Sequence, residues 1–313
     1  MKTRSAVISE RKARMKKQHE SNLEKISKGM DVLQRRTILR GKETGAWLTT
    51  MPSIVNGTEL SRQEWRDSLL LRYSLSPLDL PSKCDGCGGE FSINHAHSCK
   101  HGGLVILRHD EIKRELIDLS SMALRPTAVR DEPLITPVPN QQTSQRTMNQ
   151  QSGNNASVED PTRDGDRGDI NIRGLWKAQH ETIVDVRITD TDAKAYRHTE
   201  PANVLRNGER EKKKKYLQSC LAQRRSFTPF VVSTDGLIGI EGRSLLKQIS
   251  RKLAAKWEQP YSVVCGFVNA RINFAILRAA NLCIRGSRVP ASKMSRRVQW
   301  QDGAGLGLFD NIA

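Results

Sequence analysis

The sequence of 313 residues is short of acidic and aromatic side chains. Aromatic residues make up 5% of the chain, and 34 Asp and Glu stand against 51 Lys and Arg, which leaves a formal net charge of +17. No stretch approaches the roughly 20 apolar residues that a membrane span requires, and the N-terminal sequence MKTRSAVISERKARMKK lacks the apolar segment of a secretory signal. We therefore expect a protein that is neither secreted nor embedded in a membrane.

Cysteine is scarce as well, with six residues in the whole chain. Cys220, Cys265 and Cys283 lie in apolar sequence typical of helices and have no partner at a metal-ligand spacing. In a protein that is not exported, such cysteines are free thiols rather than disulfides. We expect all three to be buried and unpaired.

The other three cysteines form a pattern with a histidine. Cys84, Cys87, His95 and Cys99 have the spacing Cys-x2-Cys-x7-His-x3-Cys, in the sequence CDGCGGEFSINHAHSC. Four soft ligands with this spacing can surround one Zn²⁺ ion as a tetrahedron. Because all four positions are protein ligands, the pattern predicts a structural zinc knuckle without an open site for chemistry. His97 and His101 are alternatives to His95 as the histidine ligand.

The excess of basic residues is concentrated in dense runs. A surface that follows phosphates needs this kind of clustering, so the charge favours nucleic acid, DNA or RNA, as a partner. A solvated basic surface is the alternative explanation for any single run. The runs lie at 11–17, 35–42, 212–215 and 285–297.

Composition divides the chain into segments. Residues 1–45 are charged and favour helix but have few apolar positions, which predicts a basic helical arm, and 46–103 contain a helical segment followed by the knuckle. Residues 104–290 have the apolar patterning of a mixed α/β unit. Within that unit, 136–166 are rich in Gln, Asn, Ser and Thr, and we expect this insertion to be disordered. Residues 291–313 are expected to form a C-terminal tail.

Local signals predict the order of elements in the α/β unit. Ser61 and Glu64 have the spacing of a helix capping box in the segment before the knuckle. After the knuckle, apolar residues at helical spacing are followed by clusters of β-branched residues, and these predict a helix, a strand, a hairpin, a helix, a strand and two long helices. The predicted ranges are a helix starting at 104–107, strands at 128–135, 170–172, 182–189 and 228–233, and helices at 207–225, 241–258 and 261–285.

Two aspartates of the predicted hairpin are candidates for a second metal site. Asp169 precedes one strand and Asp185 lies within the next. Carboxylates that converge from adjacent strands hold a divalent cation and leave other coordination positions to water and phosphate oxygens. Arg187, Lys214 or Lys215 could add positive charge there. Taken alone, the pair is also compatible with ordinary turn and surface aspartates.

The order of motifs resembles a known family. The segments RGDINIRG, ETIVDVRITD and EREKKKKY look like the metal-binding core of the restriction-endonuclease-like, PD-(D/E)XK, nucleases. Over roughly 46–309, the chain is similar to the C-terminal part of non-LTR retrotransposon reverse-transcriptase polyproteins. In that family a Cys-Cys-His-Cys knuckle precedes an Arg-His-Asn/Asp helix start, the nuclease core, a Lys-Tyr helix and a strand of the FTPFVVSTDG type.

The resemblance implies roles for the two aspartates and for one lysine. Asp169 and Asp185 match the carboxylates that bind Mg²⁺ or Mn²⁺. The sequence departs from the family where Gly168 replaces the usual proline and where Arg187 replaces the usual lysine. Arginine keeps the charge but differs in shape and does not release a proton.

Other residues are candidates to complete the site that the resemblance implies. In this group of retrotransposons a lysine on the following helix can take the role, which points to Lys212 or Lys215. Glu111 or Glu115 on the preceding helix could complete the metal shell.

The resemblance implies a nuclear, metal-dependent endonuclease that nicks target DNA with Mg²⁺ or Mn²⁺. No Tyr/Phe-x-Asp-Asp polymerase signature occurs in the sequence, so we expect the endonuclease end without a reverse transcriptase. The alternative is a non-catalytic remnant that binds DNA or RNA through the knuckle and the arm. A third interpretation is a structural or interaction protein whose charge keeps it soluble.

Overall fold

The computed structural model describes residues 3–135 and 167–289. The predicted insertion at 136–166 and the predicted tail at 291–313 lie outside the described residues. The described chain is a mixed α/β structure with one four-stranded sheet. Its helices are α1 (Arg4–Ser27), α2 (Val32–Arg40), α3 (Arg62–Arg72), α4 (Ile93–Ser98), α5 (Leu104–Ala123), α6 (Pro201–Ala222), α7 (Ile240–Trp257) and α8 (Tyr261–Arg285).

The sheet contains both strand orientations. β1 (Val129–Asp131), β2 (Ile170–Arg173) and β3 (Glu181–Thr189) are antiparallel neighbours, and β4 (Ser226–Ser233) runs parallel to β3. Helix α6 makes the connection between β3 and β4, because a parallel pair requires a long crossover. The predicted hairpin is confirmed as β2 and β3, with Ile170 opposite Val184.

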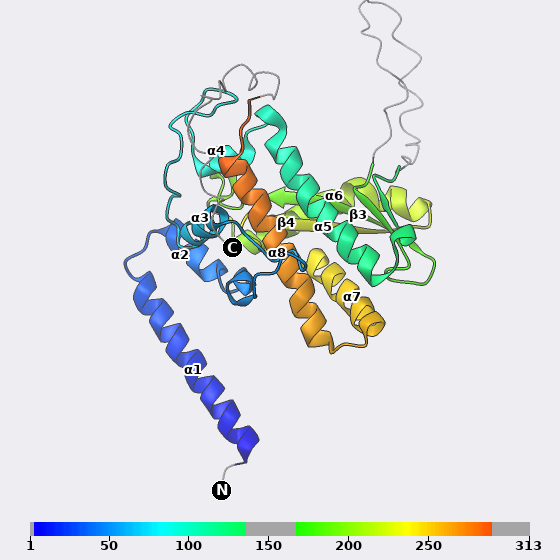
Figure 1. Cartoon of the computed structure of the whole chain (residues 1–313), viewed down its shortest axis with the longest axis horizontal. Coiled ribbons are helices and arrows are strands. Elements are labelled where there is room, and N and C mark those ends of the chain that lie inside the picture. The colour runs from blue at the N-terminus through cyan, green and yellow to red at the C-terminus, as the bar shows by residue number, and fades with distance from the viewer. Residues whose placement is uncertain (1–2, 136–166, 290–313) are drawn as a thin grey trace, which may run out of the picture.

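Helices cover both faces of the sheet. On one face, Val184 and Val186 of β3 pack with apolar residues of α5, α7 and α8 in the main core. On the other face, Ile183 packs against Tyr216 and Cys220 of α6. The two faces follow from the alternation of side chains along a strand, so Asp185 points to the α6 side. Figure 1 shows α5 and α8 crossing in front of the sheet.

Local signals in the sequence account for several helix boundaries. The predicted capping box is confirmed, since the Ser61 hydroxyl accepts a hydrogen bond from the Glu64 backbone and the Glu64 carboxylate accepts one from Ser61. A second box, between Asp31 and Gln34, starts α2 and was not predicted. Each cap satisfies backbone N–H groups that the helix leaves unpaired.

Two elements differ from the predicted ranges. The strand predicted at 128–135 is regular only at Val129–Asp131, and Leu134 adds one isolated bridge to Arg167. The helix predicted from residue 207 begins earlier, at Pro201. Proline suits the first turn of a helix because its missing N–H would have no partner there.

No stretch of the sequence was expected to be long and apolar enough for a membrane span, and helix α8 is an exception. It is long and apolar enough, by length and composition, to cross a membrane, and 67% of its most apolar window is buried inside the protein. Arginines also recur on it every seventh residue. Arg271 pairs with Glu115 at 2.6 Å, Arg278 with Glu111 at 3.0 Å, and Arg285 with Asp67 of α3 at 2.7 Å. Packing against α5, α7 and these carboxylates makes α8 the central helix of the fold.

The predicted basic arm forms two helices with different surroundings. Helix α1 extends away from the sheet (Figure 1), and Ser27 is its one buried residue. Helix α2 is attached to the strand ends. The buried guanidinium of Arg40 pairs with Asp192 at 2.6 Å and with Asp235. These carboxylates follow β3 and β4, so α2 lies across the carboxyl ends of the two strands.

Replacing Leu116 of α5 tests the assignment of the main core. Leu116 is fully buried, so Leu116→Ala should lower the free energy of unfolding by about 2–5 kcal/mol through lost burial and a residual cavity. Leu221→Ala, which truncates a leucine that is 53% exposed on α6, is the control and should cost about 0.5 kcal/mol or less. Urea unfolding followed by circular dichroism measures both. Equal losses would contradict the assignment.

Candidate metal centres

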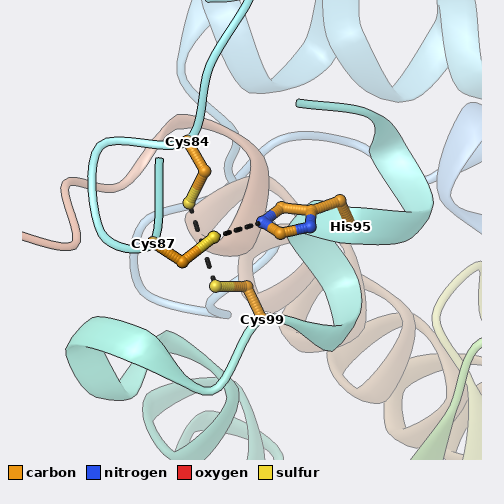
Figure 2. Close-up of side chains that lie close together, drawn as sticks. All are labelled: Cys84, Cys87, His95 and Cys99. Atoms are coloured by element: carbon orange, nitrogen blue, oxygen red, sulfur yellow. Dashed lines mark hydrogen bonds between the residues drawn. The ribbon is translucent and has the colours of Figure 1, made fainter. Parts of the chain in front are cut away.

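The four predicted knuckle ligands lie together. The ligand atoms of Cys84, Cys87, His95 and Cys99 are all within 4.8 Å of one another. Figure 2 shows the three sulfur atoms and the His95 ring pointing toward a common centre. Cys84 and Cys87 come from a turn before α4, His95 from α4 itself, and Cys99 from its C-terminal end. The cluster could bind a metal ion such as zinc.

The distances fit a tetrahedral site. The Cys84 and Cys99 sulfur atoms are 3.8 Å apart, and the Cys87 sulfur is 3.3 Å from Nε2 of His95. Two sulfurs bound at about 2.3 Å to one zinc ion with tetrahedral angles are separated by about 3.8 Å. The cysteines are therefore already spaced as zinc ligands.

The surroundings of Cys84 favour its thiolate form by lowering the pKa of its thiol. Burial raises the pKa of Cys84, but backbone N–H groups of Cys87 and Gly86 and the His95 side chain outweigh it, so that the pKa falls to about 6. The pKa of Cys99 is raised by burial and by its sulfur neighbours. Several thiolates in one place repel one another, and a bound cation removes that repulsion.

The alternative histidines lie outside the cluster. His97 is 7% exposed, and burial followed by the charge of Arg108 lowers its pKa to about 3. His101 is exposed in a short 3-10 helix after Cys99. The geometry therefore favours His95 among the three predicted alternatives.

A buried arginine attaches the knuckle to the core. Arg288, which follows α8, donates its backbone N–H to Asp85 at 2.7 Å and its guanidinium to the carbonyl oxygen of Ala96 at 3.1 Å. Gly102 has φ of +72°, and a Cβ there would lie 2.4 Å from the Arg288 Cα. Glycine is required at this position both for its backbone angle and for this close approach.

The two predicted carboxylates lie at neighbouring positions of the sheet. Asp169 leads into β2, and its Oδ2 accepts the backbone N–H of Val186 at 2.5 Å, directly beside Asp185. Asp185 is buried within β3. Burial is the main cause that raises the pKa of Asp185, and the negative charge of Asp169 raises it further. The carboxylates are thus close enough to interact electrostatically.

Each of these aspartates has a cationic or ionisable partner. Nε2 of His109, on α5, is 3.1 Å from Oδ2 of Asp169, and Nδ1 is 3.3 Å from Asp110. Although burial opposes it, the hydrogen bond to Asp169 raises the pKa of His109. The same bond helps to lower the pKa of Asp169 against the opposing effect of burial. His109 matches the histidine of the family's Arg-His-Asn/Asp helix start, and no role was predicted for it.

Lys212 is the lysine beside Asp185. Its ammonium nitrogen is 2.6 Å from Oδ2 of Asp185, so the two side chains form an ion pair. Lys215, the alternative predicted on the same helix, donates to the Tyr216 hydroxyl at 2.8 Å. Lys214 is exposed on α6.

The remaining predicted residues have partners of their own. Arg187 pairs with Glu211 of α6. Glu111 pairs with Arg278 of α8, and Glu115 is buried against Arg271. The α5 side chain that reaches Asp169 is therefore His109, where a glutamate of α5 was predicted. Within the described residues, no third Asp, Glu, Cys or His forms a metal cluster with Asp169 and Asp185.

The comparisons with known proteins do not add a family. Neither protein-family models nor curated proteins match this chain.

Removing single knuckle ligands tests the zinc centre. The purified protein should hold about one zinc ion, and Cys87→Ser and His95→Gln should each lose most of it, because a structural site uses all four ligands. Cys265→Ser and His101→Gln are matched controls outside the cluster and should keep it. Elemental analysis after gel filtration measures the stoichiometry. Retention of one zinc ion by the triple variant Cys84→Ser, Cys87→Ser, Cys99→Ser would contradict the site.

Proposed function

We propose that the protein is a metal-dependent DNA endonuclease that nicks its target, and that it derives from the C-terminal part of a non-LTR retrotransposon polyprotein. The observation that carries the proposal is the placement of Asp169 and Asp185 at neighbouring positions of the sheet, with Lys212 2.6 Å from Asp185. Two carboxylates and one amine at such a place are what phosphodiester cleavage requires. The order of elements around them follows the order of motifs in the resemblance.

The carboxylates of Asp169 and Asp185 would supply oxygen ligands to a divalent cation. His109 faces Asp169 and Lys212 faces Asp185, so a bound cation would replace or share these two contacts. Mg²⁺ or Mn²⁺ has a preference for carboxylate oxygens, and when bound it supplies an activated water and neutralises charge on phosphate. In this proposal Asp169 and Asp185 hold the cation, His109 gives up its contact with Asp169, and Lys212 contributes fixed positive charge near the phosphate.

The knuckle has a structural role in the proposal. Its four protein ligands leave no open position, and Arg288 attaches it to the end of α8. Zinc would then hold residues 84–99 against the core, while the reaction takes place at the sheet. A restriction-endonuclease-like core with a preceding knuckle is the fold that this proposal assigns.

A non-catalytic nucleic-acid-binding protein is the second candidate. It is favoured by Arg187, which stands where the family has lysine and is paired with Glu211. It is also favoured by Asp169, whose Oδ2 is already held by His109 and the Val186 backbone. In this case the basic surfaces bind DNA or RNA without cleavage.

Plasmid nicking separates the two candidates. Supercoiled plasmid should be nicked with Mg²⁺ or Mn²⁺ and stay intact in EDTA, and Asp185→Ala should abolish nicking because the cation loses a ligand. Lys212→Ala should reduce the rate by about a hundredfold, as expected for loss of one electrostatic group at the reacting phosphate. Lys214→Ala removes the same charge from the exposed face of the same helix and should have little effect.

The outcomes of the nicking experiment differ for the two candidates. Equal loss in the Lys212 and Lys214 variants would show that general affinity, rather than the site, was changed. Wild-type protein that binds DNA but does not nick it with either metal would overturn the endonuclease and leave the second candidate.

Helix α1 provides a test of nucleic-acid binding itself. It is exposed and contains Arg11, Lys12, Arg14, Lys16 and Lys17. If all five contact phosphates, replacing them by alanine should make the slope of log K against log[salt] less negative by up to about 4.5. Alanine preserves the helix. Fluorescence anisotropy from 50 to 200 mM salt measures the slope, and an unchanged slope would place the phosphate contacts elsewhere.

A further inference from the structure

A cavity of about 230 Å³ lies at the carboxyl ends of the parallel strands β3 and β4, apart from the two metal centres. Asp190 and Asp192 follow β3, and Thr234 and Asp235 follow β4. Helices α2, α3 and α4 close the cavity from the outside. The carboxyl ends of parallel strands are a recurrent place for ligands in α/β sheets, because loops diverge there and leave a crevice.

Two polar atoms in the cavity wall are buried without a partner. Nε2 of His97 is one of them, on a side chain that is 7% exposed. Oδ2 of Asp190 is the other, while Oδ1 accepts the backbone N–H of Asp192 at 3.0 Å. Buried polar atoms normally have partners, so these two indicate a ligand or ordered water.

Both unpaired atoms accept hydrogen bonds. A neutral imidazole that carries its proton on Nδ1 has Nε2 as an acceptor, and a carboxylate oxygen accepts as well. Around them lie the apolar side chains of Trp47, Leu71 and Leu277. The cavity therefore fits a small, partly apolar group that presents N–H donors.

The charges of the cavity nearly balance. Asp190, Asp192 and Asp235 line it together with Arg40 and Arg72, so neither an anion nor a free cation gains a strong net counter-charge there. Asp192 and Asp235 are already neutralised by Arg40, so a guanidinium group would lose its hydration and gain only Asp190 as a counter-charge. A neutral heterocycle with amino and ring N–H groups avoids this cost.

We propose that this cavity binds an unpaired nucleobase with adjacent N–H donors, of which guanine is the best fit. The N1–H and 2-amino groups of guanine would donate to Asp190 and His97. Uracil and thymine present a carbonyl on each side of their single N–H and would be rejected by the carboxylate. At 230 Å³ the cavity is below the size of drug-like sites and suits a single base.

The base would enter from the side of Asn94 and Ser76, which line the cavity and are exposed. Its sugar and phosphate would remain outside, away from the three carboxylates. Single-stranded nucleic acid is recognised in this way, by hydrogen bonds to the exposed edges of unstacked bases. The proposal rests on the proposed function only for the source of the base, and it deepens that function by adding a base-specific contact.

Binding of free nucleosides tests the proposal without DNA, metal or cleavage. Guanosine should bind saturably in calorimetry and in saturation-transfer NMR. Inosine, which lacks the 2-amino group, should bind about tenfold more weakly, since one buried acceptor loses its donor. Uridine should not bind measurably. L-Arginine amide is included because it presents similar donors as a cation.

Variants connect the binding to the cavity. Asp190→Asn should weaken guanosine binding by about tenfold or more, as expected for loss of a hydrogen bond to a charged acceptor. Ser76→Trp fills the exposed entrance without changing the interior and should have a similar effect. Glu59→Gln, an exposed carboxylate outside the cavity, is the matched control and should bind guanosine like the wild type.

Several outcomes would overturn the proposal. These are absence of guanosine binding, equal binding of guanosine and uridine, tighter binding of arginine amide, and unchanged guanosine binding in both cavity variants. The first would assign the cavity to ordered water only. Nicking that fails while guanosine still binds would refute the proposed endonuclease and leave the base site intact.

Discussion

The register of β3 is the constraint on which the rest of the structure depends. Antiparallel pairing with β2 and parallel pairing with β4 set Val184 and Val186 into the main core and Asp185 onto the α6 face. A slip by one residue would exchange the faces, placing Asp185 in the main core and turning Val184 and Val186 toward α6. Asp190 and Asp192 follow the same strand and so lie at the carboxyl ends of the parallel strands β3 and β4. Apolar burial at alternate positions of β3 thus fixes where the acidic groups of both regions lie.

Segments with little core of their own are attached to this sheet by buried arginines. Arg40 joins α2 to the ends of β3 and β4, and Arg288 joins the knuckle to the end of α8. A guanidinium reaches several acceptors at once, which suits it to this role. Removal of one partner from such a pair leaves a buried charge and is much more costly than loss of an exposed pair. The periphery therefore depends on a few polar contacts, while the centre depends on apolar area.

Features with a local cause could be predicted from the sequence. The knuckle ligands lie within 16 residues, the Ser61 cap within four, and the hairpin within twenty, so spacing and periodicity are enough to recognise them. The partners of the two aspartates could not be predicted in this way. His109 and Asp169 are 60 positions apart, and among four consecutive lysines only the rotation of α6 against the sheet selects Lys212. The cavity at the strand ends is still less local, since its wall is assembled from residues of α2, α3, α4 and α8 and from the segments that follow β3 and β4.

The arginines of α8 determine how this helix can sit in the protein. Arg271, Arg278 and Arg285 are seven residues apart and so lie near one line along the helix, each opposite a carboxylate of α5 or α3. The apolar remainder of the helix would tolerate many rotations and sliding positions, because hydrophobic contact has no direction. A shift by one turn would break all three pairs at once and leave charges buried without partners. The three ion pairs therefore select one rotation and one axial position of this apolar helix against α5 and α3.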